Sequence, residues 1–225
     1  MPAHFFAFLI GIAMTNLVTS ALSVALGWHI YLHSGNPIDL AIVGLMQVIP
    51  TFLFFFATGW VVDSFPRKTL IIACTIAEAL IMAGLAISMF DQEMNLAVIF
   101  SLLFVHGSVR AFYFPAKQAI VPNLVSKAQL PRAIALSSTI GNVAQTGGPL
   151  VAGLLIALVD VHIYSLLFAV LIIAAAAFHF LPTLPPMAIV PRTWATLIGG
   201  VTFVRSNSIV LGVIALDLFI VMLGS

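Results

Sequence analysis

The chain has 225 residues, of which 62% are apolar and 7% are charged, and its formal net charge is +1. Its mean hydropathy is +1.21, whereas a soluble domain carries about 25% charged residues and needs a polar surface. The composition therefore excludes a soluble globular fold and indicates an integral membrane protein. The one cysteine, Cys74, lies inside an apolar run, which leaves no disulfide framework and no cysteine metal site.

Six apolar runs are each long enough to cross a bilayer, which takes about 20 mainly apolar residues in a helix. Because lipid offers no partners to backbone groups and the runs lack the alternation of barrel strands, all of them are predicted to be helical. A seventh run begins near Ser208 and continues to Ser225. The six complete runs are residues 5–32, 40–62, 69–90, 95–116, 133–158 and 163–181.

The order of these runs predicts three parts. Residues 1–181 form a six-helix transmembrane bundle. Residues 182–207 form a linker that begins with four prolines in 182–191 and continues with apolar residues at helical spacing from Trp194 to Val204, which predicts an amphipathic helix on the inner membrane surface. Residues 208–225 start a second bundle, and we interpret the end at Ser225 as the truncation of a longer protein.

The connections between the runs differ in charge, and this difference predicts the orientation. Because cytoplasmic connections carry an excess of Lys and Arg, the N-terminus is expected on the cytoplasmic side. Seven of the eight basic residues fall on one set of alternate connections: Arg67, Lys68, Lys117, Lys127, Arg132, Arg192 and Arg205. The other set has no Lys or Arg and carries Asp39, Asp91, Glu93 and Asp160. Within the connection at 121–132, the spacing of Ser126 and Gln129 predicts a short helical turn with a capping box.

Four of the six runs carry polar stripes at helical spacing, while the third and sixth are nearly bare. Ser, Thr and Asn also join membrane helices to one another, but four striped helices beside two bare ones favour a polar cavity. We therefore expect spans 1, 2, 4 and 5 to line a cavity and spans 3 and 6 to face lipid. The stripes are Asn16, Ser20, Ser23, Gly27 and Tyr31; Gln47, Thr51 and Thr58; His106, Arg110, Tyr113 and Lys117; and Ser138, Asn142 and Gln145.

Three charged residues lie inside spans, where an unpaired charge is costly and usually functional. Arg110 either belongs to the cavity or extends towards the nearby cytoplasmic end. Glu78 either has a function or is protonated or paired on a peripheral helix, and Asp217 in the seventh run is favoured as functional. The candidate residues for the cavity and for energy coupling are Asn16, Ser20, Ser23, Gln47, His106, Arg110, Tyr113, Asn142, Gln145 and Asp217.

The sequence shows no arrangement of catalytic or metal-binding residues. His29 and His33 stand four residues apart, but they lie at a membrane interface beside Trp28 and Tyr31, where such side chains collect in any case. A zinc-protease motif, a Ser/His/Asp arrangement and a phosphate-binding glycine loop are all absent from the sequence. We predict that the protein is not an enzyme and uses no metal and no cofactor.

The turn GWVVDSFPRKTL at 59–70 carries a recognisable pattern. Gly59, Asp63, Arg67 and Lys68 match in spacing and position the loop between the second and third helices of the major facilitator superfamily, which this turn resembles. Ser64 and Pro66 replace the usual Arg and Gly. The stretch GPLVAG at 148–153, with Gly148, Pro149 and Gly153, is similar to a motif associated with exporters. RAFYFPAKQAIVPNLV and LPRAIALSSTIGNVAQTGGP look like the branch of enterobactin-exporter-like and macrolide-efflux-like carriers.

The resemblance implies a fold of two six-helix halves that rock around a central site. It implies a secondary transporter that exports a small drug-like or siderophore-like amphipathic compound across the bacterial cytoplasmic (inner) membrane by alternating access, with the proton gradient as the energy source. The expected partners are the lipid bilayer and a small molecule, with no nucleic acid, and the full-length protein is expected to be a monomer. An uptake permease of the same fold and a non-transporting half-carrier or membrane scaffold remain alternatives.

The resemblance also implies roles for single residues. Asp63 would meet a helix N-terminus of the other half when the cytoplasmic gate closes, and the lock would be weaker here because Ser64 removes one charge. Arg67 and Lys68 would hold this turn or only fix the topology. Pro149 and its neighbouring glycines would let span 5 bend and pack closely. The family's drug/proton exporters often carry an Arg in helix 4 where this chain has Leu103, so Arg110 does not simply inherit that role.

Overall fold

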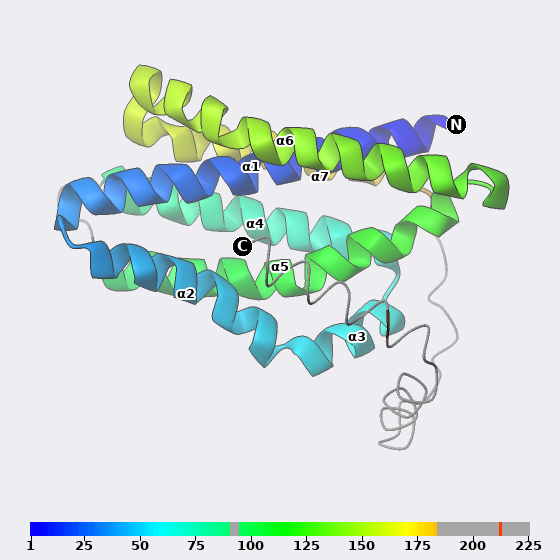
Figure 1. Ribbon diagram of the computed structural model, residues 1–225, viewed down its shortest axis with the longest axis horizontal. Helices are drawn as coiled ribbons and strands as arrows, with labels where there is room; N and C mark the ends of the chain where they lie inside the picture. The colour runs from blue at the N-terminus through cyan, green and yellow to red at the C-terminus, as the bar shows by residue number, and fades with distance from the viewer. Residues whose placement is uncertain (91–94, 184–211, 213–225) are drawn as a thin grey trace. The chain divides into compact units, whose positions relative to one another are not determined.

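The computed structural model describes residues 1–90, 95–183 and 212, and in this part of the chain all regular structure is helical (Figure 1). The helical bundle predicted from the sequence is confirmed. The predicted surface helix, the start of the second bundle and Asp217 lie outside the described residues, apart from residue 212. The elements are α1 (Ala3–Ser34), α2 (Pro37–Leu53), α3 (Phe55–Ser64), α4 (Arg67–Phe90), α5 (Leu96–Leu124), η1 (Lys127–Gln129), α6 (Leu130–Val159), η2 (Asp160–His162) and α7 (Ile163–His179).

The predicted spans 1, 3, 4, 5 and 6 correspond to α1, α4, α5, α6 and α7. The second span is different, because residues 40–62 contain two helices, α2 and α3, that are bent by 68° relative to each other. The break is at Phe54, whose ψ of 5° is far from the helical value. The Thr58 hydroxyl donates to the carbonyl oxygens of Phe54 at 2.6 Å and Phe55 at 3.0 Å, and so satisfies backbone groups at the break. The predicted span at 40–62 is therefore helical but broken into a bent pair of helices.

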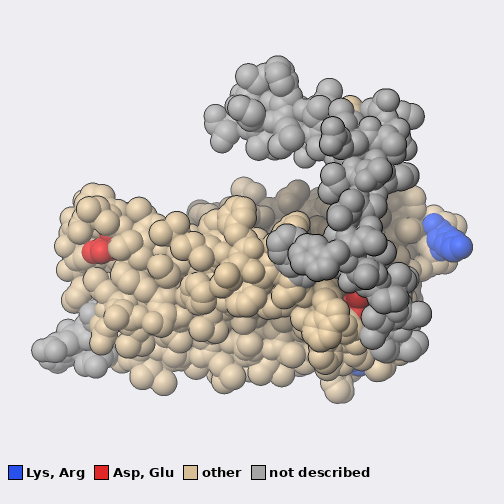
Figure 2. All heavy atoms as spheres, turned by 90° about the horizontal axis from the view of Figure 1, so that it is seen from below, with Lys and Arg blue, Asp and Glu red and all other residues tan. Residues whose placement is uncertain are grey.

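The lengths and hydropathy of the helices fit a protein that crosses the membrane several times. Four stretches of the described residues are long and apolar enough to cross, or five if α2 and α3 form one bent span. One of these stretches, Lys127–His179, contains both α6 and α7. On the face seen in Figure 2, the charged side chains lie near the two ends of the described bundle.

The α6–η2–α7 stretch turns back on itself, so it provides two crossings. Lys68 at the start of α4 donates a hydrogen bond to the carbonyl oxygen of His179 at the end of α7. At the other end, the rings of Phe90 and His162 lie 5.0 Å apart. α7 therefore runs antiparallel to α4, and the same chain segment reaches both ends of the bundle.

The buried core consists of two apolar clusters with a polar layer between them. The cluster at the end of the bundle that holds the N-terminus includes Phe5, Phe8, Ile71, Ile120 and Phe178. The cluster at the opposite end includes Leu22, Leu26, Met82, Leu85, Leu103 and Leu167. Between them, near the middle of α1, α4 and α5, lie Thr15, Thr75, Glu78 and His106, all buried. Four of the six buried polar side chains of the described residues thus meet at one level of the bundle, where their burial is costly.

Glycines allow two helix pairs to approach closely. A Cβ atom on Gly107 of α5 would lie 2.5 Å from the backbone oxygen of Gln47 on α2, and one on Gly148 of α6 would lie 2.5 Å from the Cβ of Ser20 on α1. Gly148 therefore packs α6 against α1, in line with the close packing expected for this motif. Gly153 of the same motif has open space around its Cα, and Pro149 is exposed.

The short turn predicted before α6 is present as η1, but its cap differs from the prediction. The Ser126 side chain makes no capping hydrogen bond. The backbone N–H of Gln129 donates to the carbonyl oxygen of Ser126 at 2.9 Å instead. The capping box inferred from the spacing is therefore wrong, because the backbone alone closes the turn.

Candidate substrate cavity and buried polar layer

A cavity of about 640 Å³ lies between α1, α5 and α6, in the half of the bundle that holds the N-terminus. Four of the residues predicted for a cavity line it, namely Asn16, Arg110, Asn142 and Gln145. They come from three different helices, so their polar stripes converge on one space. The other lining residues are Phe8, Ile12, Phe114, Lys117, Gln118, Val121, Pro122, Ile134, Ser137, Ser138 and Gly141.

The charge of this cavity is positive. Arg110 and Lys117 line it, and none of its lining residues is Asp or Glu. Lys117 donates to the Asn16 side-chain oxygen at 3.4 Å and lies 5.2 Å from the centroid of the Phe114 ring. In the described part of the chain the ion pairs shown are His29–Asp160 and His106–Glu78, which involve neither cation. The lining can therefore accept uncharged or anionic groups more readily than cations.

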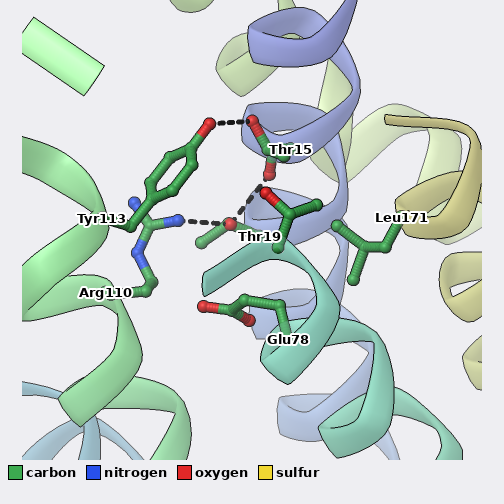
Figure 3. Close-up of a pocket in the computed structure, with 7 residues that line it drawn as sticks. Thr15, Thr19, Glu78, Arg110, Tyr113 and Leu171 are labelled. Atoms are coloured by element: carbon green, nitrogen blue, oxygen red, sulfur yellow. Dashed lines mark hydrogen bonds between the residues drawn. The ribbon is translucent and has the colours of Figure 1, made fainter. Parts of the chain in front are cut away.

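A second, much smaller pocket of about 10 Å³ lies inside the polar layer (Figure 3). Its volume is close to the space that one water needs. Tyr113 and Thr15 share a hydrogen bond of 2.8 Å between their hydroxyls, and the Thr19 hydroxyl donates to the Thr15 carbonyl at 2.9 Å. Arg110 donates to the Thr19 hydroxyl. Since Arg110 lines both the pocket and the cavity, it is a direct physical link between them.

Glu78 also lines the small pocket, and it contacts His106 within the polar layer. His106 Nδ1 lies 2.6 Å from Glu78 Oε2, which joins α5 to α4. The two side chains are 1% and 10% exposed, respectively. The second ring nitrogen, His106 Nε2, is buried and has no hydrogen-bond partner.

Sequence reasoning left Glu78 out of the candidate site because its helix looked peripheral. The helix does present Ile76, Leu80 and Ile87 outward, but Glu78 lies on its buried face. The signal was in the spacing, since Thr75 and Glu78 share one helical stripe with large buried residues. That stripe is Ile71, Thr75, Glu78, Met82 and Leu85.

Other residues predicted for the cavity do not line it. The Ser20 hydroxyl donates to the carbonyl of Gln145 at 2.6 Å. Ser23 and Gln47 donate to carbonyls one turn earlier in their own helices. His106 and Tyr113 lie in the polar layer rather than along the cavity.

His29 and His33 do not form a common site. His29 is buried and contacts the Tyr164 hydroxyl at 2.9 Å and Asp160 Oδ1 at 3.0 Å, whereas His33 is exposed. Among the described residues there is no group of three His, Cys, Asp or Glu side chains that could hold a metal ion.

Residues 3–215 match the model of a protein family described as transmembrane secretion effector. The chain belongs to this family of the major facilitator superfamily. It is a family of transporters rather than of enzymes, and its members generally need no cofactor. The match covers both the described bundle and part of the residues that follow it.

Relatives and a solved structure agree with this family. Macrolide efflux protein A of Streptococcus pyogenes is 29% identical over 141 residues, which are 62% of this chain and 35% of the relative. The staphyloferrin A transporter of Staphylococcus aureus is 25% identical over 135 residues, which are 60% of this chain and 34% of the relative. The chain thus spans about a third of the length of these relatives. A crystal structure of the POT family transporter PepTSo shares the fold with a TM-score of 0.71, at 16% identity, over 85% of this chain and 40% of that chain.

In this major facilitator chain, the loop at 59–70 joins α3 to α4. Gly59 and Asp63 lie in α3, and Arg67 and Lys68 begin α4. Arg67 Nη1 donates to the Ala119 carbonyl at 2.9 Å, and Lys68 Nζ donates to the His179 carbonyl at 2.7 Å. Both cations therefore fasten the start of α4, and Lys68 does so at the C-terminus of α7, where a positive charge is favourable.

Proposed function

We propose that this chain forms half of an exporter that moves a small amphipathic compound, drug-like or siderophore-like, across the cytoplasmic (inner) membrane. The cavity of about 640 Å³ between α1, α5 and α6 carries this proposal, because it combines an apolar wall with amides and two cations. Sites for small molecules are of this size and have this mixture of surfaces. The name of one relative, macrolide efflux protein A, supports export, and that of the staphyloferrin A transporter supports a small-molecule substrate.

The direction of access follows from the charge on the connections. With the N-terminus cytoplasmic, as the basic residues indicate, the cavity lies in the cytoplasmic half of the bundle and receives its substrate from inside the cell. Alternating access then requires the second bundle, and the proton gradient supplies the energy. The full-length protein works as a monomer in lipid.

The test is transport by the purified full-length protein in lipid vesicles with an imposed proton gradient. Iron-free staphyloferrin A is the siderophore-like probe, whose carboxylates the positive lining favours, and erythromycin is the drug-like probe, whose basic amine that lining disfavours. We expect gradient-dependent movement of at least one probe, in the direction that corresponds to export in inside-out vesicles. Movement in the opposite direction would indicate an uptake permease, and no movement of either probe by folded protein would leave the half-carrier or scaffold as the better account.

The gate can be tested separately with Asp63→Asn. If Asp63 meets a helix N-terminus when the cytoplasmic gate closes, losing its charge removes roughly 1 kcal/mol from the closed state. We expect normal insertion and a transport rate lowered by a few-fold. Asp39→Asn, at the start of α2, is the matched control and should transport like the wild type. Equal rates for Asp63→Asn and wild type at equal expression would contradict the gate.

A further inference from the structure

The Glu78–His106 pair is the more deeply buried of the two ion pairs shown in the described bundle. It lies between the two apolar clusters, near the middle of α4 and α5. The distance from His106 Nδ1 to Glu78 Oε2 is 2.6 Å. A buried ion pair stabilises a fold little compared with apolar residues of the same volume. Stability alone therefore gives no reason for a carboxyl group and an imidazole at this position.

The free ring nitrogen shows where a proton can be added. When the neutral imidazole donates from Nδ1 to the Glu78 carboxylate, Nε2 carries a lone pair. This atom is buried and has no partner in the described structure. Adding one proton there turns the imidazole into an imidazolium, and the charge of the pair changes from −1 to 0 while the Nδ1–Oε2 hydrogen bond is kept. Histidine is the side chain best suited to such a change near neutral pH.

Arg110 brings the charge of the pair to the cavity. Glu78 and Arg110 line the same pocket of about 10 Å³, where charges interact more strongly than in water (Figure 3). Arg110 also lines the cavity of about 640 Å³. Adding a proton to His106 therefore weakens the electrostatic attraction between the pair and the Arg110 guanidinium, which also lines the cavity.

We propose that the Glu78–His106 pair is the site that takes up and releases the proton of the transport cycle, and that Arg110 transmits its charge to the cavity. This inference rests on the proposed function, because it assumes a transport cycle that the proton gradient drives. The proton is taken from water on one side of the membrane, bound at His106 Nε2, and released to the other side.

The described groups around the pair include no second histidine or carboxylate that could take up this proton in its place. Arg110 and Tyr113 face it from α5 and Cys74 lies near it on α4, while α1 contributes hydroxyls of threonine and α7 contributes Leu171. The other titratable groups of the packed elements lie farther from the pair, towards the ends of the bundle: His4, His29, Tyr31 and His33 on α1, Asp39 on α2, Asp63 on α3, Arg67 and Lys68 on α4, Lys117 on α5, Asp160 and His162 on η2, and Tyr164 and His179 on α7.

The first experiment reads the proton directly and needs no substrate. The full-length protein with ¹⁵N-labelled histidine is placed in lipid vesicles, and His106 is assigned by comparison with His106→Gln. Between about pH 8 and pH 5, Nε2 of His106 should change from an unprotonated to a protonated nitrogen. Glu78→Gln should change the nitrogen signals of His106, because the carboxylate that contacts Nδ1 is lost. A His106 that keeps one protonation state over this range would overturn the proposal.

The second experiment separates coupling from binding, with erythromycin as the probe. Glu78→Gln should lose gradient-driven accumulation at least tenfold while erythromycin-for-erythromycin exchange stays within a few-fold of the wild type. His33→Gln, on an exposed histidine at the end of α1, is the control and should keep both activities. Parallel loss of accumulation and exchange in Glu78→Gln would show a structural role and overturn the proposal. If the wild type moves no erythromycin, the proposed function fails on this probe, and the nitrogen signals still decide the proton site.

Discussion

Gly107→Ala is expected to destabilise the bundle by about 1–3 kcal/mol, the usual cost of extra volume in a packed core. The added Cβ would lie 2.5 Å from the backbone oxygen of Gln47 and 3.0 Å from its Cα. A flexible side chain could turn away from this contact, but the backbone of α2 has to move as a whole. The measurement is thermal unfolding of the purified protein in detergent, where the variant should melt several degrees below the wild type.

Gly153→Ala is the matched control for Gly107→Ala. Both glycines lie within long helices, but a Cβ atom on Gly153 meets no atom within 4 Å in the described structure. Alanine is the better helix former by about 1 kcal/mol, so this variant should melt at or above the wild-type temperature. If both variants melt at the same temperature, the close contact between α5 and α2 does not limit stability.

The sequence predicted most of the helices because hydrophobic length is a local property. It did not predict the break in the second span, since residues 40–62 are mainly apolar and uncharged, and the bend shows only in the backbone at Phe54 and the contacts of the Thr58 hydroxyl. It also placed the end of the fourth span at 116, whereas α5 continues through Pro122 to Leu124. Polar residues such as Lys117 mark the approach of the membrane surface rather than the end of the helix.

The sequence predicted those cavity residues whose polar side chains recur at helical spacing on one face of a span. Asn16, Arg110, Asn142 and Gln145 were identified from their stripes, and the packing of three helices brings them to one cavity. Ser23 has the same spacing but donates to its own helix backbone. Spacing cannot separate these two uses of a polar side chain, because both occur on the inner face of a membrane helix.

Glu78 shows a different limit of sequence reasoning. On its own helix it is one acid among apolar residues, which is the pattern of a peripheral span with a structural charge. Its partner His106 is 28 residues away on another helix. Only the tertiary structure shows that the two meet between two apolar clusters and that one nitrogen remains without a partner.

Arg110→Ala is expected to lower gradient-driven transport of erythromycin about ten- to a hundredfold. The side chain donates to Thr19 in the polar layer and lines both the pocket and the cavity, so its loss removes a charged hydrogen bond worth about 1.5–3 kcal/mol. Transport rates measured over a range of erythromycin concentrations separate a change in KM from a change in maximal rate. Arg132→Ala, on an exposed residue at the start of α6, is the control and should behave like the wild type.

Arg110→Lys distinguishes the charge of Arg110 from its geometry. Lysine keeps the positive charge, but it lacks the planar fork that lets a guanidinium contact Thr19 and the cavity together. If Arg110 acts through charge alone, Arg110→Lys restores most of the transport lost in Arg110→Ala. If Arg110 must link the polar layer to the cavity, Arg110→Lys recovers the KM for erythromycin, but its transport rate still depends only weakly on the proton gradient. Unchanged kinetics in both variants would instead mean that Arg110 serves only to reach the membrane surface, an interpretation that its contact with Thr19 in the middle of the bundle already disfavours.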